Sequence, residues 1–482
     1  MPSPTPSPPT HPLYNHTPTN ITSLITTINH PTPIPGTRDP ETLASRSSTP
    51  HSPAPLPHQV PHYIFFPRST DHVSRILKAC HEKRVAVTSF AGGTSLGGAV
   101  AALWGGVCVD FGDMDAVGEV WWADLMVEVQ AGVGWVALNR VLGEGREGDG
   151  KGLFWPVDPA LGARVGGMIA MSCSGTNAYR YGTIKNWIIS MTVVLANGTI
   201  IKTRNRPLKS SAGYDLNHLI IGSEGTLALV TEAVLNSRRY RGICMSGLLL
   251  LLLCGMVSLE AIELADREAM FAIEKSGLAR GRVWDVAPTL FLKFAGSEGA
   301  VREQIEFVRE MCARFPGGGL VAASNEMEFV DTVWGGRKCL ANALVAMKND
   351  PGDLFLSTDA AVPSSKMALL VEESNRIVRE EGDSSWFCAS VGHVGDGNVH
   401  TAIVCPAAEK DRAGVLVEKI QRLALELEGT ITGEHGVGLK LRDLLEEEVG
   451  KEGVDVMRKI KFALDPRGIL NPDKVVRLEA GY

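Results

Sequence analysis

Between residues 60 and 98, the order of apolar and polar positions predicts a strand, a helix and a second strand that leads into a glycine-rich loop. The apolar run at residues 63–66 is typical of a short strand, and Ser69 has the side chain of a helix N-cap. Apolar residues at positions 73, 76 and 77 then fall on one face of a helix. Residues 85–90 form the second apolar run, and the glycines follow it directly. We therefore expect an ordered domain to begin near residue 59.

The stretch VEVQAGVGWVALNRVL, residues 127–142, predicts a strand, a turn and a helix. Its Gly132, Gly134 and Ala137 match the G-x-G-x-x-A pattern of nicotinamide cofactor sites. Such a site also needs a second strand that ends in an acidic residue about 20 positions later. Glycines occupy that region instead, so we interpret the stretch as a closely packed strand-turn-helix unit.

Residues 1–58 differ in composition from the rest of the chain, because Pro, Ser, Thr and His dominate them. Such a composition buries too little apolar area to offset the entropy of ordering, so we expect a disordered or targeting segment. It has many hydroxyl groups and no acidic residue before Asp39, as a transit peptide would. Arg38 and Arg46 are its only arginines, however, so the organellar signal is weak.

Length, charge and cysteine content limit the remaining possibilities. A chain of 482 residues is too long for one ordinary core, so two or three domains are expected. The net charge of −7 and the lack of a long Lys/Arg run argue against nucleic acid as a partner. Nine cysteines without a CxxC pair suggest reduced thiols. The apolar run at Leu248–Leu253 is shorter than the roughly 18 to 20 residues of a transmembrane span, so it predicts a buried strand.

The stretch GHVGDGNVH, residues 392–400, places a histidine near each end of a predicted hairpin. If Asp396 and Gly397 form a two-residue loop, His393 and His400 face each other across the strand pair. Side chains in this relation lie roughly 4.5 to 5.5 Å apart at Cβ, so both imidazoles could bind one metal ion. The alternative is a pair of polar residues at the mouth of a hairpin, and a third ligand elsewhere would decide between the two.

The glycine-rich loop at residues 91–98 is a candidate anion site. Glycine lets the backbone approach a ligand closely, and backbone N–H groups together with the hydroxyls of Thr94 and Ser95 can surround a phosphate. The loop is neither a P-loop nor a dinucleotide fingerprint, and a plain strand-to-loop connection is the alternative.

A set of separated motifs resembles, in the same order, those of FAD-linked D-2-hydroxy acid dehydrogenases. They are the glycine loop, FWPVDPALGARVGGMIAMSCSGTNAYRYGT at 154–183, KSSAGYDLNHLIIGSEGTLALVT at 209–231, GHVGDGNVH, TGEHGVGLK at 432–440 and DPRGILNPDKV at 465–475. Within that family the chain is similar to the D-lactate dehydrogenase (cytochrome) group, which has the FAD fold of vanillyl-alcohol oxidase and p-cresol methylhydroxylase (PCMH). The motifs cover most of residues 60–478, so the resemblance is specific.

The resemblance implies an α+β protein with a PCMH-type FAD-binding domain at residues 59–235. It further implies a substrate-binding cap at 236–455, with an antiparallel sheet covered by helices, and a C-terminal segment at 456–482 that returns to the FAD site. Residues 236–258 depart from the family pattern, because this segment is shorter and contains the leucine run. The departure fits either a genuine feature or an error in the gene model.

The same resemblance implies where FAD binds. No histidine or cysteine lies in the phosphate loop, so non-covalent FAD is expected. The implied contacts are Gly92, Gly93, Thr94 and Ser95 at the pyrophosphate, Pro156, Asp158, Gly167, Ser174, Gly175 and Tyr181 further along the chain, and Gly222, Glu224, Gly225 and Thr226 on the adenine side.

The resemblance also supplies the third metal ligand. Glu434 resembles the carboxylate that joins His393 and His400 on a divalent ion, Zn or Mn, and His435 resembles the catalytic base. An open position on such an ion lets a substrate hydroxyl bind and lose its proton more easily. Arg337 resembles the arginine that binds the substrate carboxylate. The alternatives are a structural histidine at 435 and a solvated helix arginine at 337.

The implied activity is FAD-dependent oxidation of a D-2-hydroxy acid. D-Lactate is favoured, with pyruvate as product and cytochrome c as electron acceptor, because no second cation for a dicarboxylate is evident near residues 357–367. D-2-hydroxyglutarate or glycolate dehydrogenase is the alternative among enzymes. A catalytically silent flavin-binding protein with a damaged cap is the alternative outside them. We expect a mitochondrial location, with the cytoplasm as the alternative.

Overall fold

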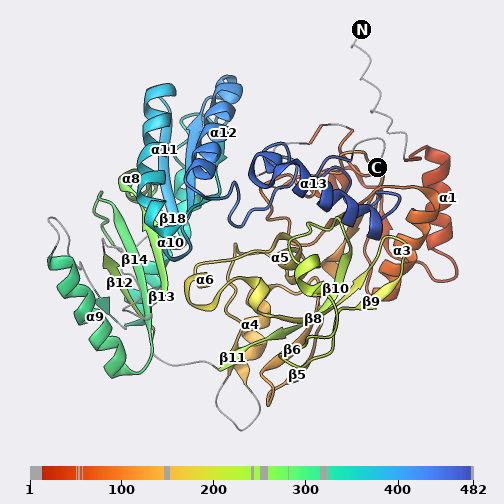
Figure 1. Cartoon of the computed structure of the whole chain (residues 1–482), viewed down its shortest axis with the longest axis horizontal. Coiled ribbons are helices and arrows are strands. Elements are labelled where there is room, and N and C mark those ends of the chain that lie inside the picture. The colour runs from red at the N-terminus through yellow and green to blue at the C-terminus, as the bar shows by residue number, and fades with distance from the viewer. Residues whose placement is uncertain are drawn as a thin grey trace. The chain divides into compact units, whose positions relative to one another are not determined.

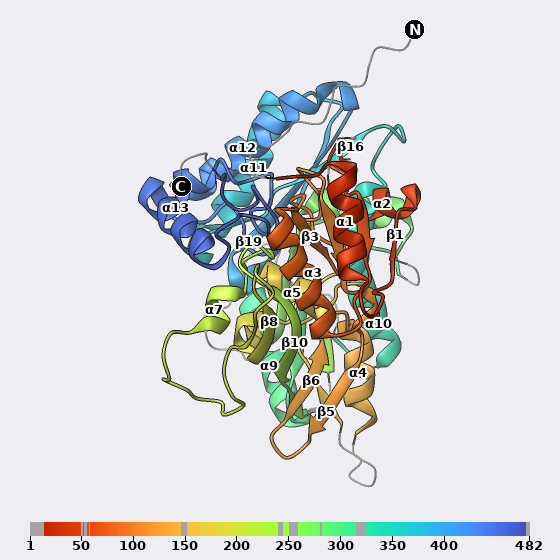
Figure 2. The ribbon, with the colours of Figure 1, turned by 90° about the vertical axis from the view of Figure 1, so that its right-hand side faces the viewer.

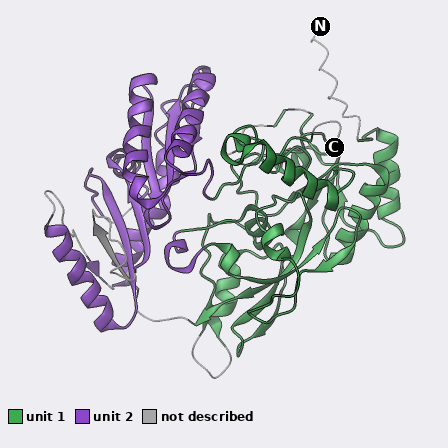
Figure 3. Cartoon of the chain, viewed as in Figure 1, with its two compact units in different colours: residues 1–175, 183–240, 434–482 green, residues 176–182, 241–433 purple. Residues whose placement is uncertain are grey.

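A computed structural model of the chain divides into two units (Figure 3). Unit 1 comprises residues 1–175, 183–240 and 434–482, and unit 2 comprises residues 176–182 and 241–433. Residues 434–455 therefore group with the FAD-binding part of the chain and not with the predicted cap. The structure describes residues 14–49, 52, 55–56, 58–145, 152–239, 244–249, 259–279, 282–314, 323–324 and 326–478.

Unit 1 contains helices and strands in an α+β arrangement (Figure 1). Its helices are α1 (Pro18–Ile28), α2 (Pro40–Ser45), α3 (Thr70–Lys83), α4 (Trp135–Glu144), α5 (Val165–Met171), α7 (Leu216–Ile220) and α13 (Leu445–Leu464). Its strands are β1 (Gly36–Thr37), β2 (Tyr63–Phe65), β3 (Val87–Phe90), β4 (Val107–Asp110), β5 (Val117–Trp121), β6 (Met126–Gln130), β7 (Leu153–Phe154), β8 (Ile188–Val194), β9 (Ile200–Lys202), β10 (Leu229–Asn236) and β11 (Arg238–Arg239).

Unit 2 is likewise α+β. Its helices are α6 (Ala178–Tyr181), α8 (Arg267–Ser276), α9 (Glu298–Ala313), α10 (Met327–Val345), α11 (Met367–Glu381) and α12 (Lys410–Glu426). Its strands are β12 (Cys244–Leu249), β13 (Leu259–Ala265), β14 (Thr289–Ala295), β15 (Ala323–Ser324), β16 (Leu354–Ser357), β17 (Ala360–Ala361), β18 (Phe387–His393) and β19 (Asn398–Cys405).

The first sheet of unit 1 has the strand order β1-β2-β4-β3, and β4 runs parallel to both β2 and β3. The predicted helix between β2 and β3 is confirmed. The Ser69 side chain accepts a hydrogen bond from the His72 N–H at the start of α3, at 3.3 Å. Val73, Ile76 and Leu77 are fully buried in the core that this helix shares with the sheet.

The expectation that residues 1–58 are disordered is wrong for residues 14–49. This stretch forms α1, β1 and α2, and α1 lies beside α3 (Figure 2). Its few apolar residues are spaced so that Ile21, Leu24 and Ile28 share one face of α1 and become buried. Composition averaged over 58 residues conceals such a local face. A targeting role for this segment stays a prediction.

The second sheet of unit 1 is antiparallel, with the strand order β5-β6-β10-β8-β9. The predicted strand-turn-helix unit at 127–142 corresponds to β6 and α4. A Cβ added to Gly132 would lie 2.1 Å from the carbonyl oxygen of Phe111. The glycine therefore serves close backbone packing, as the sequence interpretation proposed.

The C-terminal segment completes the first sheet of unit 1. Leu470 forms a parallel bridge with Val87, and the Asn471 N–H donates to the Val87 carbonyl at 2.7 Å. The buried ammonium of Lys461 donates to the carbonyls of Thr226 and Leu470, at 2.8 and 2.7 Å. Residues far apart in sequence are thereby joined within one unit.

The sheet of unit 2 is antiparallel and has helices on both faces. Its strand order is β15-β12-β14-β13-β18-β19-β16, with β17 also paired to β19. Leu290, Leu292 and Phe294 pack in a cluster with α9, α11 and α12, whereas Phe291 packs in a cluster with α8 and α10. This alternation is what a strand with two covered faces requires. The predicted antiparallel sheet covered by helices is confirmed.

The atypical segment at 236–258 is only partly described. Residues 244–249 form β12, so a strand is confirmed at the start of the leucine run, and residues 250–258 lie outside the described residues. Both β12 and β13 are antiparallel to β14. They are therefore parallel to each other, and such strands ordinarily need a connection of a dozen or more residues. Residues 250–258 are fewer than that, consistent with the shortening noted in the sequence.

None of the helices formed by the described residues has the length and apolar character needed to cross a bilayer.

Leu24→Ala tests whether the N-terminal helix is part of the folded core. Leu24 is fully buried in the cluster shared by α1 and α3, so its truncation is expected to lower the free energy of unfolding by about 2 to 5 kcal/mol. Urea unfolding of the full chain measures this change. Thr26→Ala on the exposed face of α1 is the control, and equal stabilities of the two variants would contradict the assignment.

Candidate functional site

Three adjacent strands of unit 2 place titratable side chains on one face of the sheet. Glu263 on β13 lies directly opposite His393 on β18, and His400 lies on the next strand, β19. Ala265, Val391 and Ala402 each lie two positions from one of these residues, and therefore on the same sheet face. All three pack in the cluster that contains α8 and α10. The sheet face covered by these two helices is therefore the one that carries the two histidines.

The predicted register of the histidine hairpin is wrong by two residues. His393 lies opposite Asn398, and His400 lies opposite Val391. The turn is longer than the predicted pair of residues, because Val394–Asp396 form a 3-10 turn that Gly397 ends with a φ of 68°. The histidines are diagonal neighbours on the same sheet face, and their ring centroids still lie 5.6 Å apart.

Glu263 connects His393 with Arg337 on α10. Its Oε1 accepts from His393 Nδ1 at 2.8 Å, and its Oε2 accepts from Arg337 Nε at 3.0 Å and Nη2 at 2.5 Å. The side chains of Glu263 and Arg337 are 1% and 13% exposed. Burial raises the pKa of Glu263, but the charges and hydrogen bonds of His393 and Arg337 lower it below its usual value. Glu263 is therefore a buried carboxylate that is ionised at neutral pH.

Asp359 lies close to the other histidine, His400, and also contacts the segment that leads to Glu434. His400 Nδ1 lies 3.5 Å from Asp359 Oδ1. The second carboxylate oxygen of Asp359 accepts from the Thr432 hydroxyl at 2.6 Å, and its backbone carbonyl accepts from the Gly433 N–H at 2.8 Å. Glu434 is the next residue along the chain and the first of the last segment of unit 1. The chain thus runs directly from the segment that Asp359 holds to Glu434, the predicted third ligand.

Within unit 1, Glu434 and His435 lie next to a predicted flavin contact. The Ser174 hydroxyl donates to Glu434 Oε2 at 2.6 Å, and His435 Nε2 lies 3.9 Å from Glu434 Oε1. Both side chains are partly exposed, with 16% for Glu434 and 23% for His435. The predicted base and the predicted ligand are therefore accessible to small molecules.

The glycine loop has the features that a phosphate-binding loop needs. A Cβ added to Gly92 would lie 2.5 Å from the carbonyl oxygen of Gly162, so only glycine fits there. Gly93 has a φ of 62°, which glycine adopts at no steric cost. The Ser95 hydroxyl is buried and has no hydrogen-bond partner among the described residues. A buried hydroxyl without a partner is costly, and a ligand oxygen would satisfy it.

The motif that follows the loop contains a glycine, Gly175, that leaves no room for a side chain. A Cβ added to Gly175 would lie 2.5 Å from Asp158 Oδ1. Gly167 lies in α5, where an added Cβ would meet only Ala91 at the start of the glycine loop, at 3.6 Å. Pro156 lies between β7 and α5, in the same segment as Asp158. The predicted contacts from residues 156–175 therefore gather in one part of unit 1, beside the glycine loop.

Glu224 has a structural role that the sequence did not indicate. Its buried carboxylate accepts from the N–H groups of Val437 at 2.7 Å and Gly438 at 3.0 Å, directly after the predicted base. Gly222 and Gly225 have positive φ on either side of it, and the Thr226 hydroxyl donates to the Ser223 carbonyl. The side chain of Glu224 thus fixes the segment that carries His435, and its contact with FAD stays a prediction.

The structure does not group Tyr181 with the other predicted flavin contacts. Residues 176–182 belong to unit 2, where the Tyr181 hydroxyl donates to Glu260 Oε1 at 2.5 Å. Lys293 on β14 completes this cluster, because its ammonium lies 3.2 Å from Glu260 Oε2. In the sequence, the short glycine-flanked motif around Tyr181 gave no sign that it contacts the sheet of unit 2.

Two acidic residues of the site, Glu263 and Asp359, were missed in the sequence. A usable signal existed for Glu263, since it stands within the apolar strand sequence LEAIELA, where an ionisable residue is rarely buried without a partner. Asp359 gave a weaker signal, because Thr-Asp at the end of a strand is also ordinary turn chemistry.

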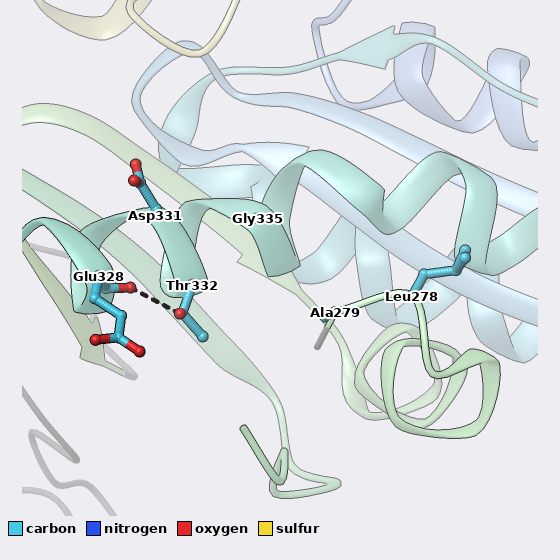
Figure 4. Close-up of a pocket in the computed structure, with 6 residues that line it drawn as sticks. All are labelled: Leu278, Ala279, Glu328, Asp331, Thr332 and Gly335. Atoms are coloured by element: carbon cyan, nitrogen blue, oxygen red, sulfur yellow. Dashed lines mark hydrogen bonds between the residues drawn. The ribbon is translucent and has the colours of Figure 1, made fainter. Parts of the chain in front are cut away.

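A surface pocket of unit 2 is lined in part by residues of α10 (Figure 4). Its α10 residues, from Glu328 to Gly335, recur with helical spacing on one face. Arg337, Val333 and Leu340 lie on the opposite, buried face, and the latter two are in the core cluster. The pocket therefore has no part in the histidine site. Its lining residues are Leu278, Ala279, Glu328, Asp331, Thr332 and Gly335.

Two family models match the chain. Residues 61–204 match the family described as FAD binding domain, and residues 255–475 match the family described as FAD linked oxidases, C-terminal domain. The first match includes the glycine loop, and the second includes Arg337 and both histidines of the hairpin.

Curated relatives align along most of the chain. D-lactate dehydrogenase [cytochrome], mitochondrial, of Kluyveromyces lactis is 39% identical over 445 residues, which cover 88% of this chain and 75% of that protein. The protein of the same name from Arabidopsis thaliana is 38% identical over 432 residues, which cover 86% and 74%. Glycolate oxidase subunit GlcD of Bacillus subtilis is 32% identical over 446 residues, which cover 88% and 91%.

Solved structures share the fold. The 4-ethylphenol oxidase of Gulosibacter chungangensis superposes with a TM-score of 0.74 at 16% identity, covering 95% of this chain and 98% of that one. p-Cresol methylhydroxylase superposes with a TM-score of 0.74 at 14% identity, covering 97% and 99%. The predicted PCMH-type α+β fold is thereby confirmed.

Glu224→Gln tests the burial of this carboxyl group. Burial raises the pKa of Glu224 from about 4.5 to about 7, against the opposing effects of the Gly438 and Val437 N–H groups and the Lys474 charge. The folded state therefore binds this proton more tightly than the unfolded state and loses stability as the pH rises from 4.5 through 7. Over this range, the wild type is expected to lose about 3 kcal/mol more than the variant.

Urea unfolding between pH 4.5 and 8 measures this difference. Glu119→Gln changes an exposed carboxyl group of the same unit and is the control, which is expected to follow the wild type. Parallel stability curves for Glu224→Gln and the wild type would show that Glu224 does not titrate in this way.

Proposed function

Because this chain belongs to the FAD-linked oxidoreductases that include the D-lactate dehydrogenases (cytochrome), we propose that it oxidises D-lactate to pyruvate. The observation that carries the proposal is the arrangement on one face of the unit 2 sheet. There, Glu263 links Arg337 to His393, and the His400 ring lies beside the His393 ring. Arginine is a residue type that binds carboxylates. A cation can bind the carboxylate of a small hydroxy acid, and a metal ion held by imidazoles can polarise its hydroxyl group.

Arg337 is proposed to bind the carboxylate of the substrate. Glu263 holds the Arg337 side chain through Nε and Nη2, so within the described residues its Nη1 edge is left for a ligand. The planar fork of an arginine fixes the orientation of a carboxylate better than a lysine does. Arg337 would thereby orient the α-carbon of the substrate.

His393, His400 and Glu434 are proposed to hold a divalent ion, Zn or Mn. The donor set of two imidazoles and one carboxylate fits either ion. Such an ion, when bound, polarises the substrate hydroxyl and lowers its pKa. His393 can contribute only Nε2, because its Nδ1 is hydrogen-bonded to Glu263.

His435 is proposed to accept the proton of the substrate hydroxyl. An imidazole has an ordinary pKa near 6.5, so it can take up a proton at neutral pH. The Glu224 carboxylate holds the backbone of Val437 and Gly438 and thereby steadies the segment that carries this base. The glycine loop and residues 156–175 would hold FAD non-covalently, and the bound flavin would supply the acceptor for the α-hydrogen, which leaves as hydride.

D-Lactate is proposed over D-2-hydroxyglutarate and glycolate. The relatives from Kluyveromyces lactis and Arabidopsis thaliana are named D-lactate dehydrogenases, whereas the less similar relative from Bacillus subtilis is named a glycolate oxidase subunit. Their names contain the words cytochrome and mitochondrial, which support a cytochrome as the electron acceptor and a mitochondrial location. We include both in the proposal, with cytochrome c as the acceptor.

Anaerobic absorbance of the purified full chain tests the substrate. D-Lactate, L-lactate, glycolate and D-2-hydroxyglutarate are added in separate cuvettes to protein that shows the spectrum of oxidised flavin. We expect D-lactate alone to bleach the flavin. Bleaching by another acid in its place would identify a different substrate, and a flavin that no acid reduces would rule out the proposed activity.

His435→Ala tests the base in the same assay. The variant is expected to keep its flavin but to be reduced by D-lactate at least about 100-fold more slowly, because positioned acid-base groups contribute 10²- to 10⁴-fold. His30→Ala replaces an exposed histidine and is the control. Reduction of His435→Ala at the wild-type rate would remove this residue as the base.

Arg337→Lys tests carboxylate binding without removing the positive charge. Loss of the fork geometry is expected to raise the KM for D-lactate by about 10- to 100-fold, since a hydrogen bond to a charged group contributes about 1.5 to 3 kcal/mol. Steady-state kinetics with an artificial electron acceptor give the value. Arg379→Lys on the exposed side of α11 is the control, and an unchanged KM for Arg337→Lys would contradict the assignment.

A further inference from the structure

We propose that Glu263 is a positioning residue that holds the metal-binding histidine His393 and the substrate-binding arginine Arg337 in one fixed arrangement. The inference rests on the function proposed above and adds a residue to it. Glu263 would touch neither the metal nor the substrate. It would act through the two residues that do, and it would couple the geometry of one to that of the other.

The two oxygens of Glu263 are divided between its two partners. Oε1 lies 2.8 Å from His393 Nδ1, and Oε2 lies 3.0 and 2.5 Å from Nε and Nη2 of Arg337. The Glu263 side chain is 1% exposed, so water does not compete for either oxygen. A rotation of the carboxylate that improves one of these contacts therefore weakens the other.

The contact with Glu263 selects one tautomer of His393. An ionised carboxylate can only accept hydrogen bonds, so His393 Nδ1 must carry the hydrogen. The lone pair of a neutral imidazole then resides on Nε2, which is the atom that can bind a metal ion. Carboxylates paired in this way with metal-binding histidines fix the ring orientation and raise the basicity of the ligand.

The location of Glu263 makes the arrangement rigid. It stands on β13 directly opposite His393 on β18, so the backbone hydrogen bonds of the sheet fix the spacing of the pair. Arg337 reaches the same carboxylate from α10, a helix that covers this face of the sheet. Two different elements therefore converge on one buried charge.

A second buried glutamate on the same strand provides a matched comparison. Glu260 pairs with Lys293 at 3.2 Å and accepts from the Tyr181 hydroxyl at 2.5 Å, and neither of these partners is a proposed metal ligand. Its replacement by glutamine removes the same charge from the same strand. A general effect of lost buried charge would therefore be seen with Glu260→Gln as well.

Metal affinity of the full-length flavoprotein tests the proposal directly. The wild type, Glu263→Gln and Glu260→Gln are freed of metal with a chelator and then titrated with Zn²⁺ and with Mn²⁺ against a chromogenic competitor. We expect Glu263→Gln to bind metal about 10- to 100-fold more weakly, the range typical for loss of such a partner. Glu260→Gln is expected to bind as the wild type does. Glutamine cannot satisfy both partners, because one of its ends is an N–H donor that would face a donor.

Steady-state kinetics provide the second readout. With metal at saturation, Glu263→Gln is expected still to have a raised KM for D-lactate, because Arg337 has lost its anchor. Glu263→Asp keeps the charge on a shorter side chain that cannot reach both partners, and it serves if the glutamine variant does not fold. It too is expected to lose metal affinity, to an intermediate degree.

The outcomes separate this inference from the proposed function. If the wild type binds metal and both Glu263 variants bind it with the same affinity, the positioning role alone is overturned. A wild type that binds neither ion would overturn the proposed metal site and this inference with it. Weaker binding by Glu263→Gln and Glu260→Gln alike would assign the effect to lost buried charge, and would also overturn the positioning role.

Discussion

Burial of a carboxylate inside a β-sheet is costly unless charged partners surround it, and the candidate site of unit 2 is arranged around one such group. Glu263 stays ionised because His393 on the neighbouring strand and Arg337 on the covering helix both donate to it. Removal of either partner would leave this buried charge with only one of its two hydrogen-bonding partners. The positions of the hairpin and of α10 relative to the sheet therefore depend on the same group that orients the candidate ligands.

Unit 1 holds the predicted base in a different way, through the backbone. The segment that carries His435 is held by the Glu224 carboxylate, which binds the N–H groups of Val437 and Gly438. A Cβ added to Gly438 would lie 2.3 Å from the carbonyl oxygen of Gly97. The segment thus lies directly against the end of the glycine loop, and this approach depends on the lack of side chains.

The sequence was sufficient for those features that local rules determine. The capped helix α3, the strand before the glycine loop and the existence of the histidine hairpin follow from periodicity, capping and turn chemistry. The hairpin register did not follow, because Asp-Gly suits both a two-residue loop and the end of a 3-10 turn, and only the contacts of β18 with β13 and β19 decide between them.

Long-range partners explain the remaining errors. Glu263 and His393 are 130 residues apart in sequence, so no local pattern reveals that they are neighbours. The fold of residues 14–49 was missed because their few apolar side chains become a core only when α3 is present beside them. The resemblance to a known family supplied the proposed ligands and the proposed base, which are motif residues, but not the acidic residues that contact them or lie near them.

The insertion of unit 2 within unit 1 has a consequence for synthesis of the chain. The first sheet of unit 1 is completed by the C-terminal segment that contains Lys461, Leu470 and Asn471. This segment is made after all of unit 2. Domains fold as units during synthesis, with earlier ones ordinarily first. Here unit 1 begins before unit 2, but the segment that pairs with its first sheet is translated after unit 2. Unit 2 can therefore complete its sheet while the first sheet of unit 1 still has an unpaired edge. A ribosome-bound chain would then expose the unpaired edge of β3 until the C-terminal segment is made.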